Sequence, residues 1–237
     1  MNLATQMVLR KPVVKAVTSS LLFLLFLTPA FGEIGNITSQ TRAAQITRKG
    51  DKILTEVNTP VEMRDLIQTL KGRANIKFVD DTKVSVTEYS KLLIDEFVYN
   101  PEKKTGKLSL KAALGTIRYS SGKIAKNSRQ NVKIKSPTAS VSVRGTDFTM
   151  NVQEDGATSF LLLPSTDTDG SSYVGSIDVS TLGGTVTLDQ AYEATTVTTA
   201  IAPPSGERTV VVQDLRIHAW FRFIRPVFQV RRTSSAS

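Results

Sequence analysis

Cysteine is absent from the 237-residue sequence, which also holds just one histidine and one tryptophan. A chain without cysteine has no disulfide, no thiolate nucleophile and no cysteine-ligated metal. The lone histidine, His218, cannot build a multi-histidine metal site and leaves few candidates for a general base. Hydrophobic residues make up 40% of the chain and charged residues 22%, which is the balance of a folded protein. The composition disfavours most hydrolytic and redox enzymes, and we predict a non-enzymatic protein without cofactor or metal.

Long hydrophobic runs are equally scarce. The most apolar stretch, residues 16–31, has 16 residues, whereas a membrane-spanning helix needs about 20. Arg10, Lys11 and Lys15 precede this stretch, and small residues at its end suit cleavage by a signal peptidase. We therefore predict that residues 1–32 are a cleaved signal peptide and that the mature chain is periplasmic or secreted, with no transmembrane span. The alternative is an uncleaved membrane anchor.

Positive charge is missing from one long segment. Residues 145–200 contain eight acidic and no basic side chains, whereas residues 71–144 contain sixteen basic and six acidic ones. Such blocks fit a docking face for a protein or glycan partner, head-to-tail contacts in a homo-oligomer, or two solvated surfaces. We take residues 145–200 as the best candidate for a docking face. Nucleic acid is not an expected partner, because no aromatic side chains alternate with the basic ones.

From residue 76 onward, apolar and polar residues alternate with the period of a β-strand. Val132 and Ile134 alternate with lysines, and Val141 and Val143 alternate with serines. Turn signals such as Asp155-Gly156 separate these runs. The pattern predicts an all-β fold, either sandwich-like or solenoid-like.

Residues 60–71 do not share this alternation. Their apolar side chains follow a helix-like spacing, and Thr59 with Glu62 would form a capping box at the start of a helix. The local pattern therefore favours a short helix in this segment.

Three segments contain recognisable motifs in a fixed order. They are FVDDTKV within residues 78–101, GTIRYSSG within residues 115–125, and SPTASVSVRGTDF within residues 134–152. Together they resemble the FecR domain family. The third motif is the most specific, and its matching residues are Ser136, Pro137, Thr138, Ala139, Val143, Arg144, Gly145, Thr146 and Phe148.

The resemblance implies an extracytoplasmic all-β domain that binds other proteins and is not catalytic. It also implies two strands between Arg64 and Phe78 in place of a helix over residues 60–71, and we adopt that expectation. Family members that act as anti-sigma regulators place a cytoplasmic segment and a membrane helix before this domain. Because 15 residues precede the apolar stretch here, we do not expect the iron-signalling role to apply.

We expect the residues of the third motif to be structural. Gly145 permits an unusual backbone conformation, and Arg144 would bond to carbonyl groups across a tight corner. The alternative is that Arg144, Gly145 and Thr146 form a loop that faces a ligand or partner.

Two carboxylate pairs, Asp80-Asp81 and Asp95-Glu96, are candidates for acid–base chemistry. The first pair belongs to a turn, and neighbouring residues of a strand point to opposite sides, so we do not expect catalysis. The run Asp167-Thr168-Asp169-Gly170 resembles half of a calcium loop without its downstream bidentate glutamate. It predicts a plain turn, with a weak cation site as the alternative.

The expected organisation has five parts. They are a signal peptide (1–32), an N-terminal linker (33–45), a FecR-type β domain (46–155), an acidic β extension (156–200) and a proline-containing basic and aromatic tail (201–237). The tail is either a final strand packed on the core or an anchor for a membrane or partner. We predict an exported protein- or glycan-binding or assembly module of the cell envelope. The alternatives are a structural component of a virus particle or surface assembly, and an envelope signalling regulator related to iron-uptake sensors.

Overall fold

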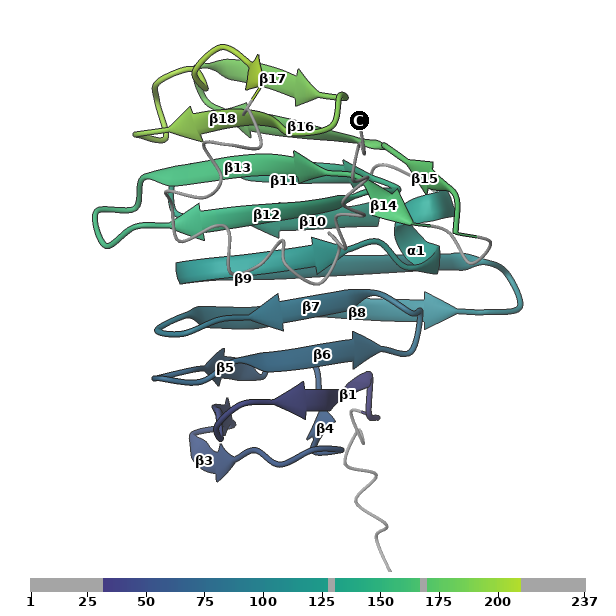
Figure 1. Ribbon diagram of the computed structural model, residues 1–237. Coiled ribbons are helices and arrows are strands. Elements are labelled where there is room, and N and C mark those ends of the chain that lie inside the picture. Colours follow the sequence, from purple (N-terminus) through teal and green to yellow (C-terminus); the bar gives the residue numbers. More distant parts are fainter. Residues whose placement is uncertain (1–31, 128–130, 167–169, 210–237) are drawn as a thin grey trace, which may run out of the picture. The chain divides into compact units, whose positions relative to one another are not determined.

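The computed structural model describes residues 32–127, 131–166 and 170–209, whose regular secondary structure is almost entirely β-strand (Figure 1). The predicted all-β fold is confirmed. Among these residues there is one short helix, α1 (Lys123–Asn127). The strands are β1 (Gly35–Gln40), β2 (Gln45–Arg48), β3 (Asp51–Leu54), β4 (Pro60–Val61), β5 (Leu66–Gln68), β6 (Ala74–Phe78), β7 (Lys83–Val86), β8 (Lys91–Asn100), β9 (Thr105–Ser120), β10 (Val132–Lys135), β11 (Ser140–Arg144), β12 (Asp147–Val152), β13 (Thr158–Leu163), β14 (Ser165–Thr166), β15 (Ser172–Tyr173), β16 (Ser176–Thr181), β17 (Gly184–Leu188), β18 (Glu193–Val197) and β19 (Arg208–Thr209).

The strands stack as two layers that share β9 (Figure 1). The front layer in Figure 1 has the order β4-β1-β6-β7-β9-β12-β13-β18-β19. The back layer has the order β3-β2-β5-β8-β9-β10-β11-β16-β17. Paired strands run antiparallel except β9 and β10, which are parallel. The chain thus fills both layers progressively, as a sandwich with a solenoid-like order of strands, while β14 and β15 form a separate hairpin.

β9 passes from the back layer to the front layer at Gly115. Residues 105–114 pair with β8, and residues 115–120 pair with β12. Gly115 has a φ of +81°, and a Cβ at this position would lie 2.2 Å from Ser90 Oγ. Glycine alone accommodates both the backbone conformation and the close contact. Ser90 Oγ also accepts a hydrogen bond from Thr116 N at 3.1 Å, which fixes the crossing point.

The core lies between the two layers. The period-2 alternation turns Val132 and Ile134 of the back layer, and Phe148 and Met150 of the front layer, inward, and all four are fully buried. Tyr119 packs against Phe148 with their ring centroids 5.5 Å apart. Complete burial of a large apolar side chain stabilises the fold by about 1.5–3 kcal/mol. The alternation predicted from the sequence is therefore confirmed and accounts for the core.

Residues 60–71 form β4 and β5, as the family resemblance implied, and the local helix signal is wrong. Ile67 is fully buried whereas Leu70 is 75% exposed, so the apolar residues do not share one face. Arg48 donates hydrogen bonds to Asp65 Oδ1 and Oδ2 at 2.8 and 2.7 Å, which holds the turn before β5. Pairing of β5 with β2 and β8 therefore overrides the helical spacing.

The acidic segment extends the same two layers. β13 and β18 continue the front layer, and β16 and β17 continue the back layer. Residues 201–209 return alongside β18, where Ser205 N donates to Thr196 O at 2.9 Å. The predicted signal peptide up to residue 31, and the aromatic tail beyond residue 209 with His218, lie outside the described residues. Within the described ranges, no helix is both long and apolar enough to span a bilayer.

Candidate functional site

The three motif segments meet at one end of the front layer. The turn between β6 and β7 carries the first motif, the end of β9 carries the second, and the corner between β11 and β12 carries the third. β7 and β12 are the two front-layer neighbours of β9, and their register aligns Lys83, Ser120 and Asp147 in one row. Segments that are distant in the sequence therefore surround one surface.

A buried carboxylate connects the first motif to the second. Asp80 is fully buried, and its Oδ2 accepts hydrogen bonds from Thr82 Oγ1 at 2.8 Å and Ile124 N at 3.2 Å. Thr82 Oγ1 in turn accepts a hydrogen bond from Gly122 N at 3.2 Å. A Cβ at Gly122 would lie 2.2 Å from Thr82 N, so a larger residue cannot approach this closely. These contacts hold the β6–β7 turn against the start of α1.

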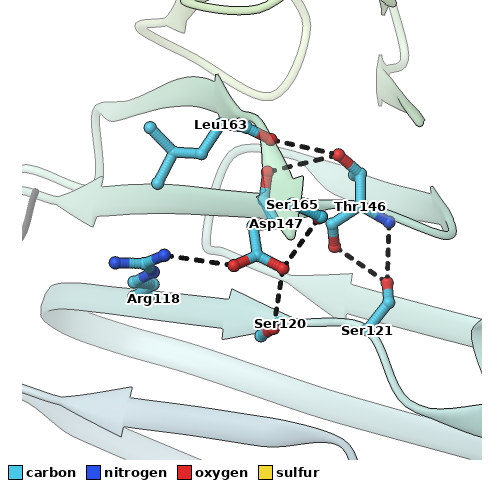
Figure 2. Close-up of polar contacts among 7 residues, drawn as sticks. All are labelled: Arg118, Ser120, Ser121, Thr146, Asp147, Leu163 and Ser165. Carbon is cyan, nitrogen blue, oxygen red and sulfur yellow. Dashed lines mark hydrogen bonds and ion pairs between the residues drawn. The ribbon is translucent and has the colours of Figure 1, made fainter. Parts of the chain in front are cut away.

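Asp147 is the centre of a polar cluster that connects the second motif to the third (Figure 2). Its Oδ2 accepts a hydrogen bond from Arg118 Nη2 at 3.1 Å. Its Oδ1 accepts hydrogen bonds from Ser120 Oγ at 2.6 Å and Ser165 Oγ at 3.0 Å. The side chains of Arg118 and Asp147 are 17% and 12% exposed. The charge pair is thus largely shielded from water, and each carboxylate oxygen has a donor.

Backbone contacts strengthen the same connection. Ser121 Oγ accepts a hydrogen bond from Thr146 N at 3.0 Å and donates one to Thr146 O at 2.8 Å (Figure 2). Thr146 Oγ1 donates to Leu163 O at 3.3 Å, and Thr146 is fully buried. The corner before β12 is therefore fixed against both β9 and β13.

A groove of about 760 Å³ lies over these contacts. Its lining contains five basic and two acidic side chains, together with several serine hydroxyl groups. We call it the basic groove, and its charged residues are Lys77, Lys83, Arg118, Lys123, Lys126, Asp81 and Asp147.

Ion pairs neutralise part of the basic groove. Asp81 binds Lys123 Nζ at 2.8 Å and Lys77 Nζ at 3.0 Å. The bonds from Lys123 and Lys77 hold the pKa of Asp81 below its usual value, and the bond to Asp81 raises the pKa of Lys123. Lys83 is exposed and forms no ion pair with any residue that the structure describes. Positive charge therefore remains available to a partner.

A second groove, of about 680 Å³, shares Lys126 and Tyr173 with the basic groove. Lys126 Nζ lies 5.9 Å from the centre of the Tyr173 ring, within the range of a cation–π contact. Its lining further includes Arg144, Gly175 and Asp189, and we call it the Arg144 groove. The shared residues make the two grooves neighbours at the same end of the sandwich.

Most residues of the third motif lie within the fold. The buried members are Thr138, Ala139, Val143, Thr146 and Phe148. Thr138 Oγ1 donates to Gly156 O at 2.9 Å, which connects the β10–β11 turn to the β12–β13 turn, while Pro137 beside it is exposed. Gly145 has a φ of +53°, a conformation that glycine adopts readily.

Arg144 does not behave as expected, because its side chain makes no bond to the carbonyl groups of the corner. The side chain is exposed and has no hydrogen bond or ion pair within the described part of the chain. The cause is the strand alternation: β11 turns Val143 inward and Arg144 outward. The guanidinium group therefore points away from the packed corner.

The two carboxylate pairs are engaged with basic partners or with the backbone. Asp95 lies at a bulge in β8, and Lys111 Nζ donates to its Oδ1 at 3.0 Å. The bond from Lys111 holds the pKa of Asp95 below its usual value. Glu96 pairs with Lys107 at 2.8 Å. A lowered pKa is the opposite of what a general acid requires.

The candidate calcium loop is not covered, because residues 167–169 lie outside the described residues. Elsewhere, among residues that the structure describes, no group of three or more histidine, aspartate or glutamate side chains could hold a metal ion.

Comparison with known proteins agrees with the motifs. Residues 65–164 match the family model described as FecR protein. The chain contains a FecR domain. The resemblance drawn from the three motif segments is thereby confirmed, and the FecR match spans the residues that build the motif contacts described above, except Ser165.

Two solved structures resemble the chain, both described as a "putative anti-sigma factor" from Parabacteroides distasonis ATCC 8503. The crystal structure at 1.65 Å has 13% identity and a TM-score of 0.43, and the match covers 64% of this chain and 62% of that chain. The one at 2.50 Å has 12% identity and a TM-score of 0.43, covering 63% and 61%. The chain thus spans about three fifths of the length of these structures. Among curated proteins, none matches.

Sequence reasoning missed the basic groove. The excess of lysine and arginine over residues 71–144 was the available signal, but the docking face was assigned to the acidic segment. The acidic side chains of that segment do not gather on one face. Asp147 and Glu193 are buried. Asp155 lies in the β12–β13 turn, whereas Asp189 follows β17 at the end of the strands away from that turn.

Proposed function

We propose that this chain is an extracytoplasmic, non-catalytic binding module, and that its FecR domain docks an acidic segment of a partner protein in the basic groove. The observation that carries this proposal is the convergence of the three motifs on one surface. Lys83 from the first motif, Arg118 from the second and Asp147 from the third all line the basic groove. The residues that build the domain therefore also shape the groove.

The charge of the groove favours an anionic partner. Asp81 pairs with Lys77 and Lys123, and Asp147 pairs with Arg118. The exposed Lys83 has no carboxylate partner among the residues that the structure describes. Exposed charges of this kind steer a partner of opposite charge and are screened over about 8 Å at physiological salt. Binding should therefore weaken steeply as salt is added.

The test compares two charge reversals of equal size in the full chain. The double variant Lys83→Glu/Lys126→Glu alters the basic groove. The matched control Lys133→Glu/Lys135→Glu alters two exposed lysines on the outer face of β10, outside both grooves. Binding of a fluorescein-labelled oligoglutamate peptide is measured by fluorescence anisotropy at 50 and 300 mM salt, with circular dichroism as the check on folding.

We expect wild type and the β10 control to bind the peptide with similar affinity, and the groove variant to lose at least about tenfold, which is about 1.4 kcal/mol. Equal losses in both variants would show unspecific attraction to net charge and would contradict the proposal. Absence of peptide binding by the wild-type chain at low salt would contradict it as well.

An envelope signalling regulator is a second candidate, because the family match itself favours it. In that case the acidic partner is a component of a signalling system, and residues 1–32 remain attached as an anchor. Mass spectrometry of the protein from its native envelope separates the two: a mature terminus at Glu33 supports the exported module, and an intact leader supports the regulator.

A further inference from the structure

The backbone at Arg144 is held by close contacts with neighbouring segments. A Cβ at Gly175 would lie 2.2 Å from the carbonyl oxygens of both Arg144 and Gly145, so these segments touch backbone to backbone. Arg144 also pairs with Ser176 at the start of β16. A side chain that begins from a fixed backbone loses less conformational freedom on binding than one on a loose loop.

The described surroundings of Arg144 contain no ion-pair partner for its guanidinium group. Asp189 lines the same groove, but no ion pair joins it to Arg144 in the described part of the chain. Lys126, the other cation of this groove, faces the ring of Tyr173. An exposed guanidinium beside a second cation, with no carboxylate bound to it in the described ranges, is suited to an external anion.

The shape of the combined surface favours a peptide over a compact anion. The basic residues come from β6, β7, β9, α1 and β11 and line two neighbouring grooves of about 760 and 680 Å³, which is far more space than one phosphate or sulfate group fills. β15 borders both grooves through Tyr173 and has β14 as its one strand partner among the described residues. Its backbone therefore offers polar groups to an extended chain between the two charged regions.

We propose that Arg144 binds a carboxylate of an acidic peptide that extends from the basic groove into the Arg144 groove. The inference rests on the proposed function, because it assigns a second contact to the same partner. The planar guanidinium donates two parallel N–H···O bonds to a carboxylate, which the single ammonium group of lysine cannot reproduce. Arg144 thus contributes geometry as well as charge to recognition.

The experiment measures the affinity of the full chain for a fluorescein-labelled peptide of alternating glutamate and serine. The variants are Arg144→Ala and Arg144→Lys, and the matched control is Arg42→Ala, an exposed arginine outside both grooves. We expect losses of about tenfold for Arg144→Ala and about threefold for Arg144→Lys, with Arg42→Ala within about twofold of wild type. The affinity for heparin, measured in parallel, should change by the same factor in Arg144→Ala and Arg42→Ala.

The outcomes separate this inference from the proposed function. If the groove variant Lys83→Glu/Lys126→Glu loses binding but Arg144→Ala does not, the role of Arg144 is refuted and the basic groove stands. If Arg144→Ala weakens peptide binding and the groove variant Lys83→Glu/Lys126→Glu does not, the proposed function is refuted. If Arg144→Ala weakens heparin as strongly as the peptide, the assignment to an acidic peptide is refuted.

Discussion

Asp147 provides the most demanding test of how the motifs hold the domain together. Replacement by alanine leaves the guanidinium of Arg118 without its carboxylate and removes the acceptor of Ser120 and Ser165. Loss of one partner of a buried ion pair costs about 3–5 kcal/mol. Because the Arg118 side chain is 17% exposed, water can solvate it in part, and we expect about 3 kcal/mol for Asp147→Ala.

The conservative variant Asp147→Asn keeps an acceptor oxygen and should lose about 1–2 kcal/mol, mainly the charge of the pair. Equilibrium urea denaturation of the full chain, followed by far-ultraviolet circular dichroism, measures both values. Asp51→Ala, at an exposed aspartate of β3, is the control and should stay within about 0.5 kcal/mol of wild type. If Asp147→Ala is as stable as Asp51→Ala, the ion pair does not hold β9 to β12 and the reasoning is wrong.

Three further predictions concern the turn, the pH dependence and the leader. Gly122→Ala should destabilise the domain by about 2 kcal/mol or more, because its Cβ would lie 2.2 Å from Thr82 N, while Gly206→Ala, with open space around it, should be neutral in the same urea assay. The lowered pKa of Asp95 means that its contribution to stability is present above the unfolded value of about 3.9 and is lost as pH falls through the folded pKa. Urea midpoints measured from pH 6 to pH 3 should therefore fall more for wild type than for Asp95→Asn, and parallel curves would contradict this. Secretion from a bacterial host should release a chain that begins at Glu33, and an intact leader would contradict cleavage.

Most of the fold could be predicted from the sequence, because the alternation of apolar and polar residues along a strand is a local property. Val132, Ile134 and Phe148 could be assigned to the core from their neighbours alone, and all are buried. Residues 60–71 show the limit of such reasoning, since their helix-like spacing is overridden by pairing of β5 with two strands that are distant in the sequence. Only the family resemblance, which reflects long-range pairing indirectly, pointed to strands.

The candidate site was harder to predict because it depends on contacts between remote residues. Arg118 and Asp147 are 29 positions apart, and nothing local marks them as a pair. Arg144 was expected to bond within the corner, but the direction of its side chain follows from the register of β11 against β16. The excess of basic residues over positions 71–144 could not show that five of them line one groove, because this depends on which side chains the fold gathers together.

Hydrogen–deuterium exchange of the full chain with and without the oligoglutamate peptide tests the central claim most directly. The account predicts that bound peptide slows exchange at the β6–β7 turn, at the end of β9 with α1, and at the β11–β12 corner, and leaves β10 unchanged. Protection confined to the outer face of the back layer, or no protection at peptide concentrations that saturate the anisotropy signal, would contradict it.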